Sequence, residues 1–164
     1  MRTTLISIAF AISGIPLGAQ QSTTPPADDQ SVYAMFFNFH HNISLAVDAK
    51  KAKNSAAGAQ FENGVAHLLR VRQDELAKVR VVSDRFISDL AKWQDDLKKY
   101  IDQTRSQKKA PDPANLAQFD QRKQRLFMVA LAQLGNTLSP TSWAALHSYI
   151  NDDYRLHISQ VKLH

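Results

Sequence analysis

The sequence contains no cysteine and few residues that build tight turns, with five glycines and six prolines among 164 residues. Without cysteine there is no disulfide framework, no thiolate metal site and no lipid-bearing cysteine behind a leader. Neither a glycine-rich phosphate loop nor a recognisable nucleophile motif is present. We therefore expect a protein that is not an enzyme, with no catalytic residues and no cofactor.

Long hydrophobic runs are also missing, apart from one at the start of the chain. This run extends from Leu5 to Ile15 behind Arg2, and a Pro-Leu-Gly-Ala segment follows it and ends at Ala19. At about eleven residues it matches the core of a signal peptide and falls short of the roughly twenty residues that cross a bilayer. We expect residues 1–19 to be a signal peptide, with no transmembrane anchor, and the protein to be periplasmic or secreted.

The rest of the chain divides into a short leader and one domain. Residues 20–30 combine two prolines with small polar side chains and no apolar periodicity, which predicts a disordered leader. Residues 31–164 have the usual length of a single domain. The net charge of +5 favours acidic partners only weakly. We expect another envelope protein as the partner rather than a nucleic acid, and homo-oligomers stay open.

Helical periodicity dominates residues 31–164, and no segment alternates with a period of two, so we expect no sheet. The clearest helix covers about 73–107, where apolar positions three and four residues apart continue from Leu76 to Thr104. This spacing is typical of a long helix packed against other helices. Further helices are predicted at about 31–52, 54–69 (short or broken), 114–135 and from Ser139 onward. The prediction is an all-α bundle of four or five helices with one long central helix. Whether the helix at 54–69 is continuous with the long helix at 73–107 stays open.

Six histidines are the only residues numerous enough to suggest metal binding or acid-base chemistry. His40 falls on the apolar face of the first predicted helix, and His147 and His157 fall on that of the last. If these helices pack together, the three imidazoles and Asp153 would form a metal site, and the alternative function is a periplasmic metal or stress sensor. The competing interpretation is that histidines on packing faces are ordinary core residues.

An aromatic cluster nearly surrounds the start of the first predicted helix. Phe36 and Phe37 follow its apolar face, but Phe39 lies at the edge of that face and Met35 on the opposite side. Because one neighbouring helix cannot bury every side, we take Met35, Phe37 and Phe39 as candidate partner-binding residues. Phe37→Asp or Phe39→Asp is then expected to leave folding intact and to abolish binding. The competing interpretation is that the first helix lies centrally and the whole cluster is core.

Two segments of the sequence resemble known groups of proteins. Together with the leader and the long helix, Tyr-Ala-Met-Phe-Phe at 33–37 and Leu-Gly-Asn-Thr-Leu-Ser-Pro-Thr-Ser-Trp at 134–143 resemble uncharacterised secreted all-helical proteins of acidobacterial type. A weaker similarity is to Spy/CpxP-like periplasmic helical proteins, which carry a Leu-Thr-x-x-Gln box. The segment from Leu138 to Ser142 resembles this box, with serine at the threonine and glutamine positions. The resemblances imply an exported helical protein with an interaction or chaperone-like role. The same Leu-Ser-Pro segment is also a good helix start.

Overall fold

The computed structural model describes residues 27–156, and this part of the chain consists of helices joined by short turns. The elements are α1 (Ala27–Lys53), α2 (Ser55–Leu68), α3 (Gln73–Ser106), α4 (Pro113–Thr137), α5 (Pro140–Ser148) and the π-helix η1 (Tyr149–Tyr154). No strand occurs within residues 27–156. The predicted fold class, an all-α arrangement of four or five helices with one long central helix, is confirmed.

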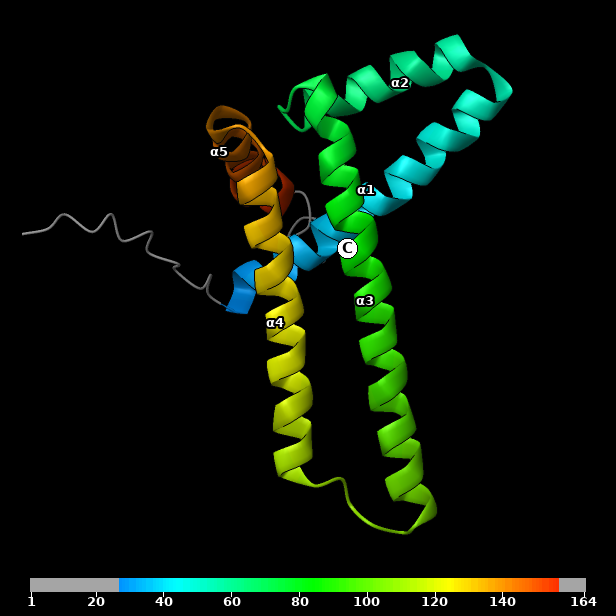
Figure 1. Cartoon of the computed structure of the whole chain (residues 1–164), viewed down its shortest axis with the longest axis vertical. Coiled ribbons are helices and arrows are strands. Elements are labelled where there is room, and N and C mark those ends of the chain that lie inside the picture. The colour runs from blue at the N-terminus through cyan, green and yellow to red at the C-terminus, as the bar shows by residue number, and fades with distance from the viewer. Residues whose placement is uncertain (1–26, 157–164) are drawn as a thin grey trace, which may run out of the picture.

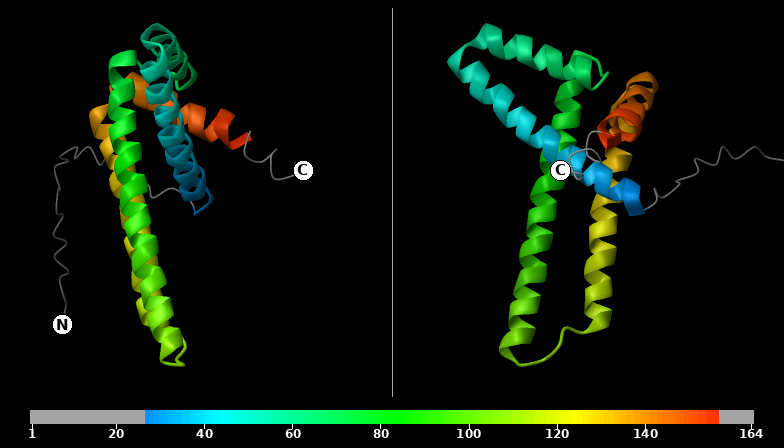
Figure 2. Two further views of the ribbon diagram at one scale, coloured as in Figure 1. Left: turned by 90° about the vertical axis from the view of Figure 1, so that its right-hand side faces the viewer. Right: turned by 180° about the vertical axis from the view of Figure 1, so that it is seen from behind.

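The helices form a long hairpin with a compact group of helices at one end. α3 and α4 run antiparallel, and α1 crosses this pair obliquely near its upper half, as seen from the front in Figure 1 and from behind in Figure 2. α2 returns from the far end of α1 to the start of α3. Below the crossing, the described helices leave the lower half of the α3–α4 hairpin without a third layer (Figure 1). The packing is therefore less regular than that of a lengthwise bundle.

Local capping explains where most helices begin. The side chain of Asn54 accepts a hydrogen bond from the Ala57 amide and starts α2, and Asp112 does the same for Ala114 at the start of α4. Ser139 caps α5, whose first residue is Pro140. The chain reverses between α2 and α3 at Arg70, which has a φ of 57°. α2 and α3 are therefore separate helices, which settles the continuity that the sequence left open.

The start of α1 differs from the prediction. Residues 27–30, assigned from the sequence to a disordered leader, form the first turn of α1. Arg155 pairs there with Asp29, from a position 126 residues further along the chain. The composition of residues 20–30 alone cannot reveal a partner so distant in the sequence. The predicted signal peptide at 1–19, the rest of the leader and residues 157–164 lie outside the described residues.

The core lies where α1 crosses α3 and α4. Tyr33, Phe36 and Phe37 of α1 are buried there together with Phe86 of α3 and Leu134 of α4. Burial of aromatic and aliphatic side chains at this crossing is the main favourable contribution to folding. Among residues 27–156, no helix combines the length and the apolar character that crossing a bilayer requires.

The close approach of α2 to α1 depends on a glycine of α2, which gives a stability prediction. A Cβ atom at Gly58 would lie 2.6 Å from the backbone N and Cα of Lys51, whereas one at Gly64 would meet nothing within 4 Å. Gly58→Ala must push α2 away from α1, and we expect a loss of about 2 kcal/mol in the free energy of unfolding. Gly64→Ala removes backbone freedom from the unfolded chain and should gain roughly 0.5 kcal/mol. Urea denaturation measures both, and equal effects at the two positions would contradict the close approach.

Candidate functional site

Three adjoining hollows, of about 470, 440 and 470 Å³, lie along the outer face of α1. The first is shared by α1 and η1, the second by α1 and α2, and the third by α1, α2 and η1. Phe39 and Tyr154 line the first and third, Ile43 the first and second, and Leu68 the second and third. They are therefore parts of one surface. We call it the α1 groove and define it by Met35, Phe39, Ile43, Phe61, Leu68 and Tyr154.

Helical spacing explains how α1 contributes both to this groove and to the core. Met35, Phe39 and Ile43 follow one another at four-residue steps and lie on the outward side of the helix. Met35 is 38% exposed and Phe39 is half-buried. Two of the three predicted partner-binding residues therefore line a groove.

Phe37 does not belong to the partner surface, contrary to the prediction from the sequence. It has no exposed surface, and its ring centroid lies 4.7 Å from that of Phe86 on α3. The side of α1 that carries Phe37 faces α3, while the side that carries Phe36 faces η1 through Tyr154. Because α1 is covered by two different elements, Phe36 and Phe37 are both core, and Phe37 cannot reach a partner in this fold.

The π-helix η1 forms one wall of the groove. It follows α5 directly, and its wider turn brings the rings of Tyr149 and Tyr154 to a centroid distance of 6.3 Å. Tyr154 then packs on Phe39, with the ring centroids 5.4 Å apart. π-Helical turns are rare and occur frequently at functional sites. No sequence signal for a π-helix was recognised, which is why Tyr149 and Tyr154 were not among the predicted site residues.

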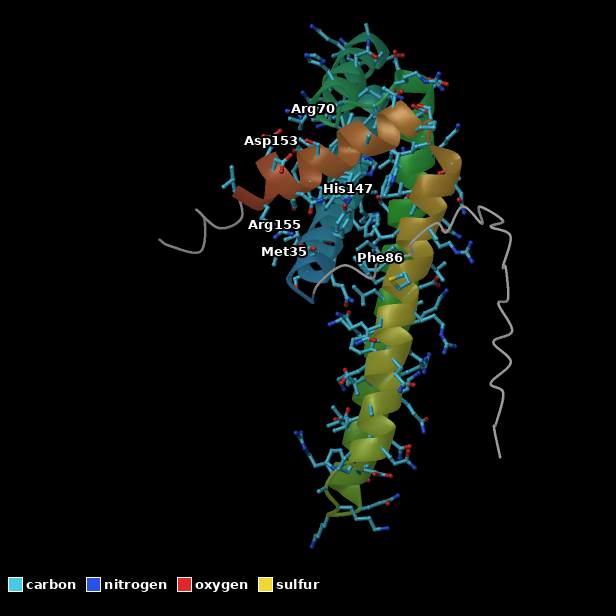
Figure 3. The ribbon with its side chains drawn as sticks, turned by 90° about the vertical axis from the view of Figure 1, so that its left-hand side faces the viewer. Met35, Arg70, Phe86, His147, Asp153 and Arg155 are labelled. Carbon is cyan, nitrogen blue, oxygen red and sulfur yellow. The ribbon has the colours of Figure 1, made fainter. Side chains whose placement is uncertain are left out.

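Charged groups lie at the ends of the groove rather than on its floor. Arg70, in the α2–α3 turn, donates a 2.6 Å hydrogen bond to Asp153 on η1 (Figure 3). At the other end, the ammonium of Lys50 lies 4.5 Å from the centroid of the Phe61 ring. Burial, with a smaller effect of Tyr149, raises the pKa of Tyr154 to about 12, so that its phenol stays neutral. Apart from Lys50, Arg70 and Asp153, the described residues that line the three hollows are apolar, amide or phenol groups, so the middle of the groove is uncharged at neutral pH.

The histidines proposed for a metal site are not brought together. His40 is buried, and burial is the main reason why its pKa is lowered to about 4, since Asp84 opposes that effect only in part. His147 is exposed and contacts Trp143 and Asn151, while Asp153 is paired with Arg70. His157 lies outside the described residues. Within residues 27–156, no group of three or more histidine or carboxylate side chains could hold a metal ion.

An ion network that the sequence analysis missed fixes α1 on α3 behind the groove. The Nδ1 atom of His41 and the Oδ1 atom of Asp84 lie 2.7 Å apart, and Arg80 donates hydrogen bonds to both carboxylate oxygens of Asp48. Arg80 also pairs with Asp84. The hydrogen bond from Arg80 is the main reason why the pKa of Asp48 is lowered. The role of His41 has no local sequence signal, because its partner Asp84 is 43 positions away in the sequence.

A buried carboxylate holds the start of α5. Glu75 of α3 is fully buried and accepts a 2.6 Å hydrogen bond from the Ser139 amide and another from the Ser142 hydroxyl. Arg72 lies 3.2 Å away on the exposed side. Burial alone would raise the pKa of Glu75, but these hydrogen bonds and the charge of Arg72 lower it to about 2. The Leu-Ser-Pro-Thr-Ser segment therefore acts as a helix start that is locked onto α3, and through α5 it positions η1.

Comparison with known proteins adds no assignment to this geometry. No protein-family model matches the chain, and no match was found among curated proteins or among solved structures. The resemblances described from the sequence therefore stay predictions. The α1 groove is the feature of the described residues that points to a function.

Proposed function

We propose that the protein is a non-enzymatic interaction module whose α1 groove binds an amphipathic helix of another envelope protein. The observation that carries this proposal is the continuous apolar surface from Met35 through Phe39 to Leu68, which the described helices leave open. Met35 is 38% and Leu68 46% exposed, although both are large apolar side chains. A groove of this kind suits the apolar face of a helix, which inserts side chains at three- and four-residue steps. The same binding mode would support a chaperone-like role.

The charges beside the groove favour an acidic partner. The last turn of α1 carries Lys50, Lys51 and Lys53, and of these Lys51 is paired with Glu62. Lys50 rests on the Phe61 ring at the edge of the groove, and no carboxylate among the described residues pairs with it. Opposite charge at the rim of an interface raises the association rate and fixes orientation. We infer that the partner helix has acidic residues beside its apolar face.

The groove lining supports binding rather than catalysis. Its side chains are mainly apolar or amide groups, and Asp153, the carboxylate at its edge, is paired with Arg70. Tyr154 is not a base at neutral pH, because its pKa is raised to about 12 by burial and, less, by Tyr149. A bound segment would therefore meet contact surface and not an activated group.

Export is the second part of the proposal and rests on the sequence of residues 1–19. The run from Leu5 to Ile15 has the length of a signal-peptide core. We expect the full chain, expressed in a bacterial host with a general secretion pathway, to be recovered from the periplasm or the medium without these residues. Mass spectrometry of the purified protein reads the new N-terminus. An intact chain found only in the cytoplasm would remove the envelope from the proposal and leave the groove unaffected.

Designed peptides test the groove directly. A fluorescently labelled amphipathic helix with leucines on one face and glutamates beside them should bind with a Kd in the micromolar range. A scrambled peptide of the same composition should bind at least tenfold more weakly, because it cannot present an apolar face. Fluorescence anisotropy at low and moderate salt measures both. Equal binding of the two peptides would contradict a shaped groove.

A matched pair of variants locates the peptide on the protein. Phe39→Glu places a charge in the middle of the groove and should weaken binding at least tenfold while the helical circular dichroism is kept. Val81→Glu is the control, since Val81 is 66% exposed on α3 and lines none of the three hollows. Similar loss of affinity in both variants would show that the peptide binds elsewhere.

A further inference from the structure

A fourth hollow, of about 390 Å³, lies on the inner side of α1, between the first turns of that helix and the α3–α4 pair. Its apolar lining comes from Ala34 on α1, from Phe86 and Leu90 on α3 and from Phe127 on α4. Met35 of α1 also lines it, and Figure 3 labels Met35 and Phe86. Its volume is within the range of about 300 to 1,000 Å³ that is usual for small-ligand sites.

The oblique crossing of α1 explains why this space exists. Toward its N-terminus α1 moves away from α3 (Figure 2). Ala34, with its short side chain, lines the hollow on the α1 side. Leu90, one helical turn beyond the buried Phe86, is only partly buried. Apolar side chains that line a space without neighbours lose dispersion contacts, so an apolar occupant would stabilise this end of the core.

The charged residue in the lining of the cavity is Lys123. Within residues 27–156 no ion pair joins its ammonium to a carboxylate. The ammonium lies 5.5 Å from the centroid of the Trp93 ring, whereas the adjacent Arg122 is neutralised by Asp96 at 3.0 Å. Gln30 and Ser31 add neutral hydrogen-bonding side chains from α1. An apolar cavity with one unneutralised cation at its edge complements a ligand with an aliphatic tail and one negative charge.

We propose that this cavity binds the aliphatic tail of a medium-chain fatty acid, with the carboxylate at Lys123. The tail lies between Phe86, Leu90 and Phe127, and the carboxylate accepts a hydrogen bond from the lysine ammonium. Burial of methylene groups is favourable, so a tail of roughly ten carbons supplies most of the affinity. The ammonium selects carboxylates over neutral lipids of the same length. The cavity and the peptide groove share Met35 at their border, but Ala34 and Lys123 line the cavity and none of the three hollows on the outer face of α1.

Titration calorimetry of the full chain tests the site with decanoate and decanol, both below the concentrations at which they aggregate. Decanoate should bind the unaltered protein at one site, and Lys123→Gln should weaken it at least tenfold while decanol is unaffected. Lys123→Arg should retain binding. Lys99→Gln is the control, since Lys99 is an exposed lysine on α3 that lines no part of the cavity.

Filling the cavity supplies the second arm of the experiment. Ala34→Leu should abolish binding of both decanoate and decanol, and its thermal unfolding should occur at or above the temperature of the unaltered protein. No binding of decanoate to the unaltered protein would overturn the proposal, as would binding that neither Lys123→Gln nor Ala34→Leu changes. The peptide assay separates the two proposals, because neither substitution touches the α1 groove.

Discussion

Phe37→Asp should unfold the protein, whereas Phe39→Asp, two positions further along the same helix, should leave it folded. The Phe37 ring has no exposed surface and packs on Phe86 in the centre of the core. Truncation of such a ring to alanine already costs about 3 to 5 kcal/mol, and a carboxylate adds the cost of burying an unpaired charge. That total is comparable with the whole stability of a domain of this size.

Circular dichroism and thermal unfolding of the two matched variants test this prediction. Circular dichroism should show loss of helix and of the cooperative thermal transition for Phe37→Asp. Phe39 is half-buried at the surface, so Phe39→Asp should keep both, with a modest decrease of the transition temperature. A folded Phe37→Asp variant would mean that α1 does not pack on α3 as described. It would also restore Phe37 to the candidate partner surface.

The contrast between Phe37 and Phe39 shows what the sequence pattern could determine. Three- and four-residue spacing correctly identified α1 as helical and identified its main apolar face. It could not tell how many elements would cover the helix, because that number depends on where α3 and η1 lie. Phe36 and Phe37 are about 100° apart on the helix, and both are buried only because two separate elements meet α1 there.

Helix boundaries were predictable where the signal is local. The predicted range 73–107 agrees with α3 at Gln73–Ser106, and Ser139 before Pro140 correctly marked the start of α5. The first turn of α1 was missed because it pairs with Arg155. The π-helix was missed because its sequence looks like an ordinary helix continuation. Tertiary contacts decide both features, and they leave no local signature.

The candidate groove was predictable only in part for the same reason. Met35 and Phe39 could be found as apolar residues outside the main face of α1. Leu68 and Tyr154 could not, because they reach the groove from separate helices whose positions depend on the α2–α3 turn and on α5. The alternative metal site depended on the same kind of long-range packing, and within residues 27–156 no group of three histidine or carboxylate side chains could hold an ion.

Glu75→Ala should be the most damaging substitution of a charged residue within α3. It leaves the Ser139 amide and the Ser142 hydroxyl without their acceptor in a buried position, and it releases α5 from α3. Loss of these bonds should cost about 3 kcal/mol in the free energy of unfolding. Asp74→Ala is the control at the neighbouring position. Asp74 pairs only with the exposed Arg72, so its removal should change stability little.

The pH dependence of stability tests whether Glu75 stabilises the protein through its ionised carboxylate or only through the space that its side chain fills. Burial would raise the pKa of Glu75, but the hydrogen bonds from Ser142 and Ser139 outweigh burial and lower the pKa from 4.5 to about 2. The stability that Glu75 contributes is therefore complete above pH 4.5 and is lost as the pH falls toward 2. Burial lowers the pKa of His40 from 6.5 to about 4. Its neutral form therefore supports the folded state fully above pH 6.5, and this stability is lost as the pH falls from 6.5 to about 4. Urea denaturation from pH 7 to pH 3 should show both losses in the unaltered protein and only the His40 loss in Glu75→Ala. Parallel curves below pH 4.5 would mean that the Glu75 carboxylate is not the ionised acceptor that holds α5.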